Sequence, residues 1–224
     1  MDRILSEGAD VPQLLVGASG SGKSSLLRAE VLPVLRGEYG FLPLQLTPGR
    51  DPMGALTSAL SAQWNAVHRA QWADEADDAV ELAAHVKTLA QRESVRVVVA
   101  VDQLEEVFTA CPDPAGRERF LRCRADLPSL DVRVTGCLRG DFYGQALDQR
   151  PLATALQKGR TVVGALGEDE ICAVAGGPAA KAGLVLDEGF VDVLLADLRG
   201  SGPGALPCCR TRCCLPGDAG AAPP

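Results

Sequence analysis

The sequence is poor in histidine, aromatic side chains and lysine. Its two histidines, His68 and His85, lie on presumed helices without partner ligands, so a histidine-based metal site is not expected. Trp64 and Trp72 are better explained by packing than by stacking on nucleic-acid bases. The chain carries 22 basic and 29 acidic residues, a net charge of −7, which is the wrong sign for gripping a nucleic-acid backbone or an anionic membrane. We therefore expect no nucleic-acid partner and no membrane partner.

Long apolar runs are also absent. No stretch approaches the roughly 18 to 20 consecutive apolar residues of a membrane span, and the opening residues lack the basic start and apolar run of a signal peptide. Cys111, Cys123, Cys137 and Cys172 are scattered singly, as in a reducing compartment, so a cytoplasmic location is expected. The other four cysteines crowd into residues 208–214.

What is present is the pattern of an α/β domain. With 46% apolar residues the 224-residue chain is expected to be globular. Apolar runs recur at intervals too long for hairpins, with helix-like segments between them, which predicts a parallel sheet covered by helices. The expected strands are 13–16, 42–46, 95–101, 132–138 and 161–163. The expected helices are 24–35, 52–66, 77–91, 117–126, 168–184 and 187–198, with Pro33 ending or kinking the first.

A glycine-rich segment between the first strand and the first helix matches G-x-x-x-x-G-K-[ST]. In such a P-loop the backbone N–H groups point at phosphate oxygens, Lys23 reaches the β- and γ-phosphates, and the Ser24 hydroxyl ligates Mg²⁺. A flexible Gly/Ser turn is the alternative, but the flanking strand and helix favour the P-loop. The expected nucleotide-binding residues are Gly17, Ala18, Ser19, Gly20, Ser21, Gly22, Lys23, Ser24 and Ser25.

Acidic and basic residues follow the later strands. Asp102 follows the strand VVVAV, at the sheet edge where open α/β folds bind ligands, and we expect it to hold Mg²⁺ through the water shell of the ion. Either Glu105 or Glu106 is the catalytic acid that orients or deprotonates the attacking water. Arg139 follows the next strand and is expected to approach the γ-phosphate. The alternatives are a surface-loop acid and a solvated arginine.

Longer stretches resemble a known family. QLLVGASGSGKSSLLRAEVLPVL, VVVAVDQLEEVF, CLRGDFYG and KAGLVLDEGFVDVLLADLRGSGPGALP together resemble the novel STAND NTPases, the ATPase modules of bacterial signalling proteins, which are often joined to WD-type repeats. The resemblance implies a P-loop NTPase fold with a five-stranded parallel sheet in the order 5-1-4-3-2, sandwiched by helices. It also implies a slowly hydrolysing, nucleotide-gated switch that uses ATP, ADP and Mg²⁺ and is often a homo-oligomer.

The same resemblance assigns roles to individual residues. Lys23 and Ser24 become the Walker A pair, Asp102 the Walker B acid, and Arg139 the sensor arginine. Pro207, in GALP, becomes the proline that contacts nucleotide at the start of the helical region. The expected division is a short lead (1–12), an NTPase core (13–165), the start of a helical lid (166–207) and an irregular tail (208–224).

Two departures from the family suggest a chain truncated at both ends. The lead is too short for the Phe-x-Gly-Arg-like element that packs the adenine, so weak nucleotide affinity is expected. After GALP, relatives read LLSHALL and this chain reads CCRTRCC. The competing function is therefore a remnant that folds but no longer hydrolyses ATP or signals. A DNA-associated P-loop ATPase is a further alternative. The absence of a basic stripe in the sequence argues against it.

The tail predicts a frameshift. Deleting one C after the proline codon of CTG CCG CTG CTG TCG CAC GCG CTG CTG yields Leu-Pro-Cys-Cys-Arg-Thr-Arg-Cys followed by a codon that begins TG, which agrees with residues 206–214. A zinc cluster is the alternative reading, but adjacent cysteines suit tetrahedral geometry poorly. Sequencing the gene should reveal a family-like continuation in another frame beyond Pro207, and its absence there would contradict the frameshift.

Overall fold

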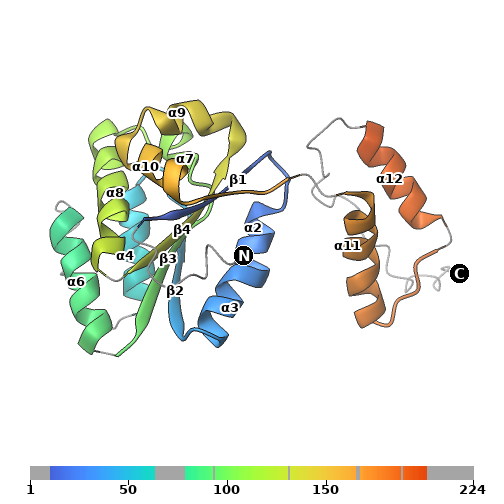
Figure 1. The fold of residues 1–224 in the computed structure, drawn as a ribbon, viewed down its shortest axis with the longest axis horizontal. Helices are drawn as coiled ribbons and strands as arrows, with labels where there is room; N and C mark the ends of the chain where they lie inside the picture. The colour runs from blue at the N-terminus through green and yellow to red at the C-terminus, as the bar shows by residue number, and fades with distance from the viewer. Residues whose placement is uncertain are drawn as a thin grey trace, which may run out of the picture. The chain divides into compact units, whose positions relative to one another are not determined.

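A computed structural model describes residues 11–63, 79–92, 94–130, 132–164, 167–187 and 189–200. The chain divides into two compact units, residues 1–165 and 166–224 (Figure 1). The expected tail (208–224), Pro207, His68 and both tryptophans lie outside the described residues. Within those residues, none of the helices combines the length and hydropathy needed to span a bilayer.

The first unit is built on a five-stranded, all-parallel sheet. Its strands are β1 (Gln13–Gly17), β2 (Phe41–Leu46), β3 (Arg96–Val101), β4 (Arg133–Arg139) and β5 (Arg160–Val162). Their order is β2-β3-β4-β1-β5, with every neighbouring pair parallel. The expected fold class and strand order are thereby confirmed. The observed strand ends agree with the expected ones to within one residue.

Helices separate consecutive strands. The segment after β1 consists of α2 (Lys23–Leu26), a π turn (Leu27–Val31) and α3 (Leu32–Gly37). The later ones are α4 (Pro52–Gln63), α6 (Ala79–Arg92), α7 (Glu106–Thr109), α8 (Pro114–Asp126), α9 (Tyr143–Leu147) and α10 (Arg150–Lys158), with 3₁₀ turns at Leu127–Leu130 and Gly140–Phe142. Pro33 does not end the first helical segment, which continues to Gly37. The irregularity falls just before it, where the Leu32 N–H donates to the Leu27 carbonyl across the wider π turn.

Side chains alternate along each strand and so create two apolar faces. In β1, Leu14 and Val16 join the larger core cluster, whereas Leu15 joins the smaller one. Residues of α4, α6, α8 and α10 complete the larger cluster, and residues 27–35 complete the smaller. Figure 1 shows α6 and α8 on one side of the sheet, and α2 and α3 on the other. Burial on both faces explains why β3 is apolar almost throughout.

The second unit contains two helices in its described part. These are α11 (Glu168–Lys181) and α12 (Phe190–Gly200), as the sequence pattern predicts. Three acidic residues occupy the first turn of α11, and Glu170 accepts a hydrogen bond from the Gly167 N–H at 2.7 Å. Acidic side chains at this end suit the partial positive charge of the helix N-terminus.

Candidate nucleotide site

The loop between β1 and α2 depends on its glycines. Gly20 and Gly22 have φ angles of 77° and 83°, in the left-handed region that side chains disfavour. Gly17 is constrained differently, because a Cβ atom there would lie 2.3 Å from the Val163 carbonyl oxygen. Val163 is held in that place by its N–H, which donates to the Val16 carbonyl at 2.7 Å. The loop therefore keeps its shape only with glycine at these positions.

Lys23 is bound by this loop. Its Nζ donates to the carbonyls of Gly17 at 2.9 Å and Ala18 at 2.5 Å, and lies 3.4 Å from the Ser21 Oγ. The residue is only 7% exposed. Burial lowers the pKa of Lys23 below its ordinary value, and the nearby Glu105 carboxylate opposes that shift. The ammonium group is thus fixed by acceptors that belong to the same loop.

Asp102 follows β3 and is fully buried. Its Oδ1 accepts hydrogen bonds from the Ser24 hydroxyl at 2.7 Å and from the Gln103 N–H at 3.0 Å. Its Oδ2 forms an ion pair with Arg28 at 2.6 Å. Gln103 has a φ of 51°, an uncommon conformation for a residue with a side chain. This turn aims the carboxylate at the segment that follows the loop.

Glu105 and Glu106 point to different places. Glu105 is 9% exposed and lines the pocket beside Lys23, and its carboxylate accepts a hydrogen bond from the Arg139 N–H at 3.2 Å. The Glu106 carboxylate accepts from the Gly49 N–H at 3.0 Å, in the connection between β2 and α4. Of the two, Glu105 is therefore the carboxylate that faces the loop.

Arg139 ends β4 directly beside the loop. Strand pairing places it opposite Gly17, and the residue lines the same pocket as Lys23. The guanidinium donates to Asp141, and its Cζ lies 5.5 Å from the centre of the Phe142 ring. Asp141 and the aromatic ring thus restrain the side chain at the pocket wall.

These groups share one small polar pocket of about 270 Å³. It is lined by Ser19, Gly20, Lys23, Ser24, Asp102, Gln103, Glu105, Cys137 and Arg139. Half of the site residues expected from the sequence are thus brought together: Ser19, Gly20, Lys23, Ser24, Asp102, Glu105 and Arg139. Six of the expected residues do not line the pocket, namely Gly17, Ala18, Ser21, Gly22, Ser25 and Glu106. Pro207 lies outside the described residues.

Three residues at the site were not anticipated from the sequence: Gln103, Arg28 and Cys137. Gln103 directly follows Asp102 and donates its N–H to that carboxylate. Arg28 lies four residues after Ser24, so helical spacing places both on one face. Cys137 lies two residues before Arg139 in β4, so strand alternation directs both side chains the same way. Both signals are present in the sequence, and both depend on knowing where the helix and strand begin.

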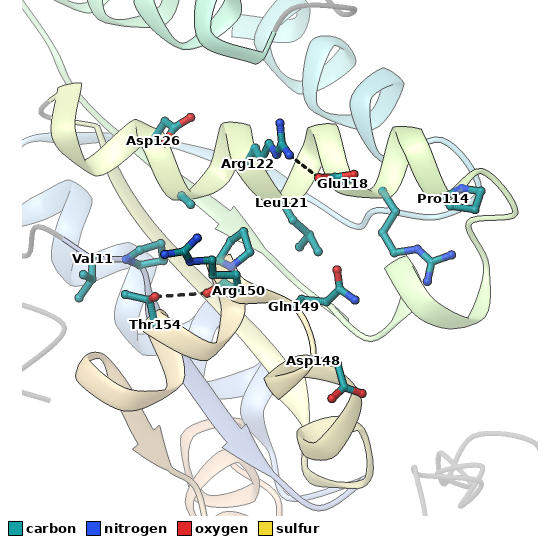
Figure 2. Close-up of a pocket in the computed structure, with 14 residues that line it drawn as sticks. Val11, Pro114, Glu118, Leu121, Arg122, Asp126, Asp148, Gln149, Arg150 and Thr154 are labelled. Atoms are coloured by element: carbon teal, nitrogen blue, oxygen red, sulfur yellow. Dashed lines mark hydrogen bonds and ion pairs between the residues drawn. The ribbon is translucent and has the colours of Figure 1, made fainter.

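A larger groove of about 830 Å³ lies elsewhere, between α8 and α10 (Figure 2). It is lined by oppositely charged side chains, among them Arg122 and Glu118, which pair with each other. It shares no residue with the pocket at the loop. Size alone would favour this groove, but the chemistry of the smaller pocket makes that one the candidate functional site.

No cluster of three or more acidic, histidine or cysteine side chains that could hold a metal ion occurs among the described residues.

Solved structures share this fold at low identity. The ORC1 protein of Aeropyrum pernix in complex with DNA matches with a TM-score of 0.61 and 16% identity, over 91% of this chain and 52% of that one. Domain III of the DnaA replication initiation protein of Thermotoga maritima matches at 0.56 and 16%, over 89% and 77%. DnaA of Aquifex aeolicus bound to AMPPCP matches at 0.52 and 14%, over 89% and 56%. This chain spans about half the length of the first of these proteins.

Sequence comparison is more specific. Among curated proteins, none matches the chain significantly. A family model described as Novel STAND NTPase 1 matches residues 1–210, almost the entire chain.

The buried thiols make stability dependent on pH. Burial raises the pKa of both Cys137 and Cys123 to about 12, whereas an unfolded thiol titrates near pH 8.5. Below about pH 8.5 both states keep the proton. Above it the unfolded state ionises first, so the free energy of unfolding should fall as pH rises from about 8.5 toward 12.

Urea unfolding of the wild type and of the Cys137→Ala variant, across this pH range, measures the effect. The variant should lose less stability per pH unit than the wild type because one of the two thiols is gone. Equal slopes for both proteins would contradict the assignment to Cys137.

Proposed function

Because the chain belongs to the novel STAND NTPase 1 family, we propose that it is the ATP-binding, slowly hydrolysing switch domain of a bacterial signal-transduction protein. The observation that carries the proposal is the convergence of Lys23, Asp102, Glu105 and Arg139 on one polar pocket. These residues come from three separate segments of the chain. A structural role alone does not require such a convergence.

Phosphate binding on this proposal is an exchange of partners for Lys23. The Nζ now bonded to the Gly17 and Ala18 carbonyls would turn to the β- and γ-phosphates, where it meets full negative charge. The loop N–H groups provide further donors for phosphate oxygens. Because Lys23 is already desolvated, the exchange does not require stripping water from the ammonium group.

The Walker A and Walker B residues fit a magnesium ion. The Ser24 hydroxyl and the Asp102 carboxylate lie 2.7 Å apart, and such oxygen donors are the ligands that Mg²⁺ prefers. When bound, Mg²⁺ would neutralise charge on the β- and γ-phosphate oxygens. Few protein ligands are needed, because in such sites water and phosphates complete the coordination.

Glu105 is the residue we assign to the attacking water. Water attacks the γ-phosphorus, the bond to the β–γ bridging oxygen breaks, and ADP and phosphate leave while the water's proton passes to a carboxylate. Glu105 lies at the pocket wall, and its Oε2 is oriented by the Arg139 N–H. Glu106 is bound to Gly49 and lines no part of this pocket.

Arg139 is the proposed sensor of the γ-phosphate. Its present partner is Asp141, so contact with a phosphate oxygen would redirect the guanidinium away from the turn after β4. The family resemblance places such a change in a switch that favours one form with ADP and another with ATP, often as a homo-oligomer. Use of ATP and the free thiols of Cys111, Cys123, Cys137 and Cys172 support a cytoplasmic location.

DNA does not enter the proposal. Two neighbouring structures contain DNA, but at 16% and 14% identity the likeness concerns the fold alone. The net charge of −7 favours a small anionic ligand held in a local pocket over a long nucleic-acid backbone.

Mg-ATP is expected to stabilise the wild type and not the Lys23→Ala variant. Ligand at about 100 times its dissociation constant adds roughly 2.7 kcal/mol, or about 5 to 10 °C in Tm for a chain of this size. Thermal shift measures it, with Lys158→Ala as a control for loss of a lysine far along the chain on α10. Lys158→Ala should respond like the wild type.

Two outcomes of the thermal-shift experiment would contradict this prediction. A folded wild type that shows no shift with Mg-ATP or Mg-ADP would favour the alternative, a remnant whose motifs are inherited and whose nucleotide binding is lost. An equal shift in Lys23→Ala would place the nucleotide elsewhere.

The two glutamates provide a second prediction. Glu105→Gln should lower kcat by about 100-fold or more while retaining ATP binding, because the amide cannot accept the proton. Glu106→Gln should stay close to the wild type, since its amide oxygen can still accept from the Gly49 N–H. Single-turnover assays measure the rate of ATP hydrolysis in both variants. A larger loss of hydrolysis rate in Glu106→Gln than in Glu105→Gln would assign the attacking water to Glu106 instead.

A further inference from the structure

Arg28 is the charged partner that the described structure gives to the buried Asp102. Its Nη2 lies 2.6 Å from Oδ2, while Oδ1 is taken by Ser24 and Gln103. The Asp102 side chain is fully buried, and the Arg28 side chain is 53% exposed. The two partners of this ion pair therefore differ in their surroundings. The Asp102 carboxylate lies in the protein interior, whereas the Arg28 side chain contacts solvent.

Other cations near the site have their own partners. The Lys23 ammonium is bound by the loop carbonyls, and the Arg139 guanidinium is bound by Asp141. Among the described groups, the Cys137 thiol also contacts Asp102 through a hydrogen bond but carries no charge. Neutralisation of the Asp102 carboxylate thus falls to Arg28.

A guanidinium and a divalent cation compete for this carboxylate. Both need its oxygen lone pairs, and two positive charges at one small anion repel each other. Because Arg28 is half exposed, its guanidinium can move into water without leaving a charge buried.

We propose that Arg28 is a metal-competing counter-ion: it neutralises Asp102 in the metal-free domain and is displaced by the divalent cation that arrives with nucleotide. The proposal rests on the function proposed above. It adds that the displacement of Arg28 distinguishes the metal-bound site from the metal-free one. Metal binding is weakened by this competition, since the ion binds only when Arg28 has left. Displacement also releases the contact between the π turn and the end of β3.

The test uses Arg28→Gln, which removes the charge and keeps most of the side-chain length. Arg36→Ala is the matched control, an exposed arginine on the same helical segment. The first readout is the Mg²⁺ concentration at half-saturation for binding of a fluorescent ADP analogue. It should fall by about fivefold or more in Arg28→Gln and stay unchanged in Arg36→Ala.

A second readout needs no nucleotide. In urea unfolding with EDTA, Arg28→Gln should destabilise the protein, and the loss should be much smaller on an Asp102→Asn background, where no buried charge is left unpaired. An excess of Mg²⁺ should reduce the loss in the single variant. A merely structural role for Arg28 predicts equal destabilisation on both backgrounds and no change in Mg²⁺ dependence.

Failures of the two proposals are distinguishable. A wild type that binds no ADP analogue at any Mg²⁺ concentration overturns the proposed function. Urea unfolding of the Arg28 and Asp102 variants in EDTA still tests the ion pair in that case. A wild type that binds nucleotide, together with an unchanged or raised Mg²⁺ midpoint in Arg28→Gln, overturns the role of Arg28.

Discussion

The buried carboxylate of Asp102 is the constraint on which the rest of the site depends. A carboxylate with no exposed surface is unstable unless hydrogen bonds and an opposite charge replace its water. Here the replacements come from the loop segment through Ser24, from the next residue through Gln103, and from the π turn through Arg28. Satisfying one charge thus ties the end of β3 to the first helical segment. The same two oxygens are the ones that a metal ion would need.

Sheet register supplies the remaining geometry. Parallel strands end at one edge, and pairing of β1 with β4 places Gly17 opposite Arg139. On the other side of β4, the Leu104 N–H donates to the Cys137 carbonyl, so the turn that carries Glu105 is anchored to β4 as well. Residues far apart in the sequence therefore meet without long side chains having to bridge the distance. The first strand in the sequence, β1, lies inside the sheet between β4 and β5. The pocket forms at the end of this interior strand, which is where open α/β folds usually bind their ligands.

Sequence reasoning succeeds where the cause is local or periodic. The P-loop glycines, the apolar strands and the acid after β3 follow from spacing and burial, and the strand order from the family resemblance. The choice between Glu105 and Glu106 could not be made, because it depends on the positive φ of Gln103 and the tight turn leading into α7. Helices α9 and α10 were missed: α10 begins with Arg-Pro after a short polar stretch, and its nine residues barely reach helical length. Pro33 was expected to end or kink the first helix, because proline lacks an N–H donor; the π turn just before it has no sequence signature of its own.

Charge balance then decides what kind of ligand this pocket can accept. Lys23, Arg28 and Arg139 face Asp102, Glu105 and Asp141, so the cations and anions around the site are equal in number. A phosphate chain entering alone would meet the carboxylates as well as the cations and gain little net attraction. A phosphate chain that arrives with Mg²⁺ brings the charge that neutralises Asp102 and thereby frees Arg28. On the proposals made above, metal and nucleotide bind as one unit, because each removes the electrostatic obstacle to the other.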